Sequence, residues 1–131
     1  MSKKVLLVGH CGPDSSYLRM VVRQADPSAK VLMADDAREL RAALDGGVDL
    51  ILFNRELGYG FDESQGVELI KWLKPNYPTI PLMLVSNYPE AQADAVAAGA
   101  LPGFGKREIG SPRIPALLRD VLTQNSAAPS K

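Results

Sequence analysis

The sequence predicts a doubly wound α/β fold, in which a five-stranded parallel sheet carries helices on both faces. Five short apolar runs alternate with segments whose apolar residues recur about every 3.6 positions. Each run is apolar at consecutive positions, which is typical of strands buried on both faces. Strands joined by single helices run parallel through right-handed crossovers. We therefore expect one domain over residues 1–124, followed by a flexible tail over residues 125–131.

The first strand is predicted at residues 4–8, and a turn rich in glycine and proline follows it. Asp14 or Ser15 is expected to cap the next helix, which ends before Asp26 and Pro27. The apolar residues of this helix fall on one predicted face, formed by Tyr17, Leu18, Val21, Val22 and Ala25.

The second strand is predicted at residues 30–34, and Asp35 or Asp36 is expected to cap the helix after it. Gly46 and Gly47 end that helix. The third strand is predicted at residues 49–53. The helix that follows is expected to stop at Lys74, because Pro75 disfavours helical geometry in the residue before it.

The last two units contain predicted strands at 80–85 and 101–105, with an alanine-rich helix at 89–98 between them. Ser111 is expected to cap the final helix. Its apolar residues are Ile114, Leu117, Leu118, Val121 and Leu122. The whole pattern is a βα unit repeated five times.

The composition excludes several classes of partner. Fifteen basic residues balance fifteen acidic ones, so we expect neither a nucleic acid nor an anionic membrane as a partner. The first apolar run is too short for a signal peptide, and no run approaches the roughly 20 residues of a membrane helix. A single cysteine, Cys11, excludes an internal disulfide. These observations favour a cytoplasmic protein.

Gly9 and six polar residues follow the predicted strands at the edge where ligands of open parallel sheets bind. They are Gly9, His10, Asp35, Asn54, Glu56, Ser86 and Lys106. This set and its order resemble the receiver domain of bacterial response regulators. The resemblance extends from Lys3 to about Leu122 and is carried best by residues 49–54, 66–71, 80–86 and 98–100. It implies a flavodoxin-like sheet with strand order 2-1-3-4-5 and a place in two-component phosphorelay signal transduction.

The resemblance also assigns roles to these positions. Receiver domains accept a phosphoryl group on an aspartate of strand three, and two acids after strand one help that aspartate to hold Mg²⁺. A serine or threonine and a lysine then bind the phosphoryl oxygens, and Ser86 and Lys106 match them. Asn54 occupies the phosphoacceptor position, whereas Gly9 and His10 occupy the positions of the acidic pair. Because Mg²⁺ requires carboxylate oxygens, we expect no metal, no cofactor and no catalytic residue.

We therefore predict a pseudo-receiver that is not an enzyme and acts as a protein–protein interaction module. The family's usual partner face implies contacts through the fourth helix, fifth strand and fifth helix. A homodimer is a further possibility. The aromatic switch residue of the family is replaced by Gly103. Two alternatives remain: a working phosphoacceptor that uses Ser86 or Glu56, and a small-anion or nucleotide binder. Because the carboxylates are lost, sulfate or phosphate is expected to stabilise the fold more than Mg²⁺ does.

Overall fold

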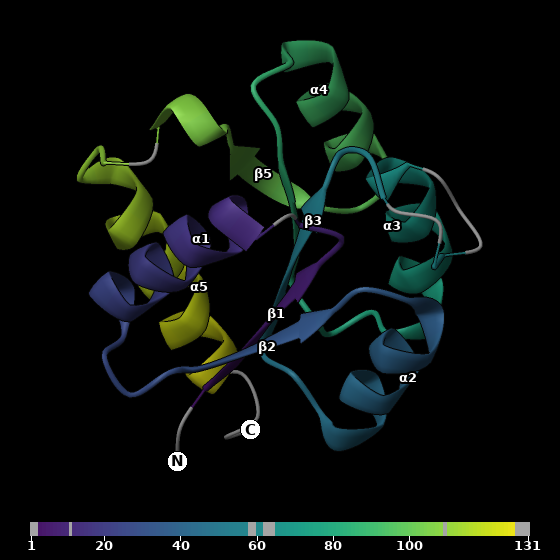
Figure 1. Ribbon diagram of the computed structural model, residues 1–131, viewed down its shortest axis with the longest axis horizontal. Helices are drawn as coiled ribbons and strands as arrows, with labels where there is room; N and C mark the ends of the chain where they lie inside the picture. Colours follow the sequence, from purple (N-terminus) through teal and green to yellow (C-terminus); the bar gives the residue numbers. More distant parts are fainter. Residues whose placement is uncertain (1–2, 11, 58–59, 62–64, 109, 128–131) are drawn as a thin grey trace.

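The described residues form one parallel sheet with helices on both faces (Figure 1), in a computed structural model. The structure describes residues 3–10, 12–57, 60–61, 65–108 and 110–127. Its five strands lie in the order β2-β1-β3-β4-β5, so the predicted doubly wound architecture and strand order are confirmed. All four pairings are parallel. The strands are β1 (Lys4–Val8), β2 (Lys30–Ala34), β3 (Leu50–Asn54), β4 (Leu82–Val85) and β5 (Leu101–Phe104).

Two helices cover one face of the sheet and three cover the other (Figure 1). The first pair is α1 (Gly12–Ala25) and α5 (Arg113–Ala127), and the second group is α2 (Ala37–Gly46), α3 (Gly66–Asn76) and α4 (Pro89–Ala97). A short 3₁₀ helix, η1 (Lys106–Glu108), lies between β5 and α5. Among the described residues, no helix is long and apolar enough to cross a membrane.

Each inner strand supplies side chains to two separate hydrophobic cores. In β1, Val5 and Leu7 pack in the core under α1 and α5, whereas Leu6 and Val8 pack in the core under α2, α3 and α4. All four side chains are at most 1% exposed. Burial on both faces explains why the strand sequence is apolar at consecutive positions and does not alternate.

The first helix differs from its prediction at two positions. It begins at Gly12, so Asp14 lies in its first turn and does not precede the helix as a cap. Tyr17, which was expected on the apolar face, is 56% exposed. The buried stripe of α1 instead includes Ser15 and is completed by Leu18, Val21, Val22 and Ala25. Tyr17 lies at the border of this stripe, where its phenol group stays in water.

Two helix ends also lie beyond their predicted limits. Helix α3 continues through Pro75 to Asn76, because proline in a last turn removes only one hydrogen bond where carbonyl groups already lack partners. The side chain of Asn76 donates to the carbonyl oxygen of Trp72 at 2.7 Å. Helix α5 continues to Ala127, and residues 128–131 lie outside the described part. The predicted cap of α2 is confirmed, since Asp36 accepts from the backbone N–H of Glu39.

Candidate functional site

The carboxyl edge of the sheet holds a polar hollow of about 170 Å³ between the ends of β3, β4 and β5. Four of the predicted site residues, Asn54, Glu56, Ser86 and Lys106, line it together. The remaining lining residues are Arg55, Val85, Asn87 and Tyr88. The structure therefore brings the predicted pocket residues into one place, although Gly9 and His10 do not line it.

The side chain of Asn54 is engaged in backbone hydrogen bonds. Its Nδ2 donates to the carbonyl oxygen of Gly9 at 3.1 Å and to that of Glu56 at 2.9 Å. The amide thus joins the end of β1 to the loop after β3. A carboxylate has no hydrogen to donate, so an ionised aspartate could make neither bond. The neutral amide at this position is a structural cross-link.

Gly9 cannot carry a larger side chain in this arrangement. Its φ is +75°, which L-residues with side chains rarely adopt. A Cβ atom placed here would lie 2.7 Å from Cδ2 of Leu57, a residue of the loop after β3. That loop therefore packs over the first position of the family's acidic pair.

His10, at the second position of that pair, is turned into the protein. Only 5% of the residue is exposed, and Nε2 lies 2.9 Å from the carbonyl oxygen of Leu52. Because a carbonyl oxygen only accepts, Nε2 carries the hydrogen and Nδ1 does not. Among the described residues, Nδ1 has no hydrogen-bond partner. Burial lowers the pKa of His10 to about 4, so the imidazole is neutral at pH 7.

The charges at the site are paired. Nζ of Lys106 lies 2.5 Å from Oδ2 of Asp14, in the first turn of α1. Arg55 pairs with Glu56 at 3.1 Å, and its guanidinium carbon lies 4.7 Å from the centre of the Tyr88 ring. Two cations and two carboxylates therefore offset one another around the hollow. Lys106 is therefore not left uncompensated by the loss of the carboxylates, which counts against the predicted stabilisation by sulfate or phosphate.

Ser86 has a local structural role. The residue is 7% exposed, and its Oγ accepts from the backbone N–H of Tyr88 at 3.1 Å. Such a bond stabilises the turn between a strand and the following helix. Ser86 thus both lines the hollow and shapes the start of α4.

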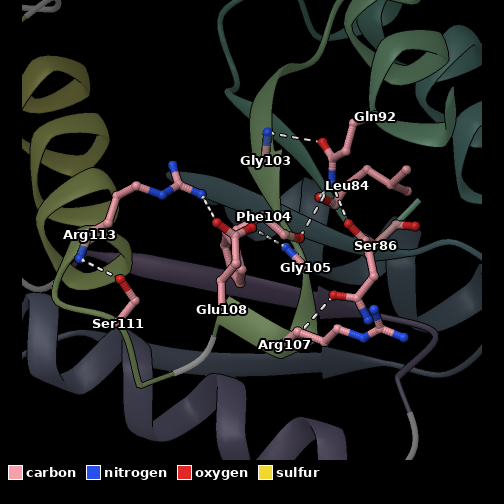
Figure 2. Close-up of polar contacts among 11 residues, drawn as sticks. Leu84, Ser86, Gln92, Gly103, Phe104, Gly105, Arg107, Glu108, Ser111 and Arg113 are labelled. Atoms are coloured by element: carbon pink, nitrogen blue, oxygen red, sulfur yellow. Dashed lines mark hydrogen bonds and ion pairs between the residues drawn. The ribbon is translucent and has the colours of Figure 1, made fainter. Parts of the chain in front are cut away.

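The backbone that carries Lys106 is held by side chains on either side of it. Figure 2 shows Glu108 between Gly105 and Arg113: its Oε2 accepts from the backbone N–H of Gly105 at 2.8 Å, and its Oε1 pairs with the guanidinium of Arg113. These contacts keep the pKa of Glu108 below its usual value. The side chain of Asn87 accepts from the backbone N–H of Arg107 at 3.0 Å. The position of Lys106 is therefore set by β4, β5 and α5 together.

Sequence reasoning missed three contacts that shape this edge. Leu57 lies in the loop after β3, and no local pattern shows that it packs on Gly9. The contact of Arg55 with Tyr88 joins residues far apart in the sequence. Gln92 could have been found, because it lies three residues before Ala95 on the buried side of an alanine-rich helix. In the described part of the chain, no group of three His, Cys, Asp or Glu residues is placed to hold a metal ion.

The fold matches a known class of domain. No protein-family model matches the chain, and no curated protein matches it. Solved structures do match, and the neighbours are receiver domains of response regulators, so the chain has the CheY-like, flavodoxin-like fold.

Individual structures show how close the likeness is. The receiver domain of an HD domain-containing protein from Pseudomonas fluorescens Pf-5 is 19% identical, with a TM-score of 0.79 over 99% of this chain and 93% of that one. The beryllofluoride-activated NtrC4 receiver domain dimer is 17% identical, with a TM-score of 0.75 over 93% and 98% of the two chains. NtrX from Brucella abortus is 19% identical with a TM-score of 0.79. The match covers 99% of this chain but 29% of NtrX.

Proposed function

We propose that the chain is a pseudo-receiver, a signalling module with the receiver fold that acts through protein contacts and accepts no phosphoryl group. The two hydrogen bonds from Nδ2 of Asn54 to the carbonyl oxygens of Gly9 and Glu56 carry this proposal. They give the residue at the phosphoacceptor position a structural task that an ionised aspartate could not perform. An amide is also a poor nucleophile toward phosphorus.

The surroundings of Asn54 support the same conclusion. Phosphoryl transfer needs Mg²⁺ to neutralise the charge of the transferring group, and Mg²⁺ is held by carboxylates. Leu57 packs where a side chain on Gly9 would stand, and His10 is buried and neutral. Lys106 is paired with Asp14. The acceptor and the metal ligands of a working receiver are thus replaced, and the lysine that is kept is paired with a carboxylate.

Intact-mass spectrometry after incubation with a small phosphodonor and Mg²⁺ tests the lack of phosphoryl transfer. We expect no added phosphate on the wild-type chain or on Asn54→Asp, while a receiver domain with an aspartate acceptor gains phosphate in the same reaction. Phosphate on the wild-type chain that persists in Asn54→Ala would overturn the proposal and point to Ser86 or Glu56 as the acceptor.

The proposed partner face consists of α4, β5 and α5. Its exposed apolar residues include Val96 of α4 and Leu101 of β5, which are 44% and 39% exposed. The charged residues of α4, Glu90 and Asp94, are both acidic, which favours a partner with basic groups opposite this helix. A second copy of the chain is the alternative occupant.

Capture from cells of the source organism tests the partner face. The baits are the wild-type chain, Val96→Asp, and Met20→Asp as a control on the exposed side of α1. We expect a partner that binds the wild-type chain and the control but not Val96→Asp. Size-exclusion chromatography of the same three proteins detects self-association. Equal capture by all three baits, with equal elution, would contradict this face.

A further inference from the structure

The edge pairing between β4 and β5 is interrupted by a bulge. Met83 pairs with Leu101 and Val85 pairs with Phe104, so Leu84 lies opposite two residues, Pro102 and Gly103. Bulges leave backbone groups outside the regular ladder of hydrogen bonds. An unpaired backbone group away from water lowers stability, so such groups require other partners.

The side chain of Gln92 supplies these partners from α4 (Figure 2). Its Oε1 accepts from the backbone N–H of Gly103 at 3.1 Å. Its Nε2 donates to the carbonyl oxygens of Leu84 at 2.9 Å and Ser86 at 3.1 Å, and a third carbonyl oxygen, that of Phe104, lies at 3.4 Å. A single primary amide therefore bridges both strands at the bulge. It uses its donor and acceptor ends at once, which few other side chains can do.

Little else attaches α4 to the sheet. Among its described residues only Ala95 is buried, while Ala91 is partly buried against the core. A methyl group buries little apolar surface, so these contacts hold the helix weakly. Gln92 is consequently the main directional contact between α4 and the two strands.

Gly103 is matched to this contact. A Cβ atom at this position would lie 2.2 Å from the carbonyl oxygen of Leu84 and 3.1 Å from Oε1 of Gln92. Any side chain here would therefore push β5 away from β4 and from the amide of Gln92. The absence of a side chain on Gly103 allows the close approach on which the Gln92 contact depends.

We infer that Gln92 is a conformational latch that fixes α4 against the β4–β5 edge, and that its opening frees this face while the rest of the sheet stays folded. The inference rests on the proposed function, because the latched elements are the proposed partner face. The latch keeps that face in one arrangement without phosphorylation. The family's aromatic switch residue is absent at Gly103, and the side chain of Gln92 instead holds α4, β4 and β5 in one arrangement.

Hydrogen–deuterium exchange at pH 7 tests the latch in the wild-type chain, Gln92→Met and Gln92→Glu. Methionine keeps the length of the side chain but cannot make the four contacts. Glutamate cannot donate to the carbonyl oxygens when it is ionised. Gln24→Met, on the exposed side of α1, is the matched control.

We expect exchange over residues 89–104 to accelerate about tenfold or more in Gln92→Met and further in Gln92→Glu. Exchange in α1, α2 and β1 should stay within about twofold of wild type, as should all segments of Gln24→Met. Equal exchange in Gln92→Met and wild type would overturn the latch, and so would uniform acceleration in every helix.

A measurement on the unaltered chain covers the case in which a variant does not fold. In the wild type, the amide hydrogen of Gly103 should exchange as slowly as those of β4, although it lies at a bulge of an edge strand. Exchange at the rate of an open loop would contradict the latch. Failure of the latch does not change the result expected with the phosphodonor. Phosphorylation of the chain does not change the exchange rates expected for the latch, so the two proposals can fail separately.

Discussion

Nδ2 of Asn54 lies 3.1 Å from the carbonyl oxygen of Gly9, so the residue at the phosphoacceptor position is bonded to the residue at the position of a metal-binding acid. In the receiver domains that the chain resembles, the residues at these two positions help to hold a magnesium ion. Here one hydrogen bond spans them directly. The same atom also donates to the carbonyl oxygen of Glu56, which holds the loop after β3 at this edge.

Replacing Asn54 by the aspartate that the family carries should therefore destabilise the protein. In Asn54→Asp, an ionised carboxylate would face two carbonyl oxygens from which it can only be repelled. We expect the free energy of unfolding at pH 7 to fall by about 1–3 kcal/mol. Urea unfolding followed by circular dichroism measures this change.

Asn87→Asp is the matched control for that substitution. The side-chain oxygen of Asn87 accepts from the backbone N–H of Arg107, and a carboxylate can accept in the same way. We expect its unfolding free energy to lie within about 0.5 kcal/mol of wild type. Equal losses for both variants would show that charge alone, and not the loss of donors, is responsible.

Substitution of Gly9 tests how the loop closes the site. Gly9→Ala meets both a positive φ and the side chain of Leu57. We expect a loss of about 1–3 kcal/mol in unfolding free energy, which denaturant melts can measure. Gly46→Ala is the control, because the last residue of α2 has open space around it and alanine favours helix. Its stability should be unchanged or higher by up to about 1 kcal/mol.

The single histidine predicts how stability depends on pH. The pKa of His10 is about 4 in the folded protein and about 6.5 when it is exposed, so the unfolded chain binds the extra proton between these values. The contribution to stability is complete above pH 6.5 and is lost as pH falls toward 4, by up to about 3 kcal/mol. Denaturant melts from pH 7.5 to 4.5 should show this slope, and His10→Asn should remove most of it. An equal slope in both proteins would assign the effect to other groups.

The sequence predicted the fold because local patterns determine most of it. Continuous apolar runs mark strands that are buried on both faces, and Asp36 marks its helix start through a short-range bond to Glu39. The pocket members Asn54, Ser86 and Lys106 were predicted because strand ends converge at one edge. Their partners were not, because contacts between distant segments leave no local signal. Asp14 pairs with Lys106 from the first turn of α1, which starts at Gly12, two residues before the earlier of its two predicted caps.

The pairing of Asp14 with Lys106 should be detectable through the titration of His10. In the folded protein Lys106 lowers the pKa of His10 and Asp14 raises it, both by their charges. We expect the pKa of His10 to rise in Lys106→Met and to fall further in Asp14→Asn. Because both side chains of the pair are partly exposed, each substitution should cost less than about 1 kcal/mol in unfolding free energy.

The chain contains one histidine, so its imidazole resonances can be followed by NMR without ambiguity. Met20→Leu, on the exposed side of α1, should leave the titration unchanged. Shifts of the same sign in Lys106→Met and Asp14→Asn would contradict the predicted charge effects, because a cation and an anion must act on an imidazolium with opposite signs. Opposite shifts would place the buried imidazole within the field of this ion pair. The charges of Asp14 and Lys106 would then act on His10, which occupies the second position of the family's acidic pair and carries no carboxylate.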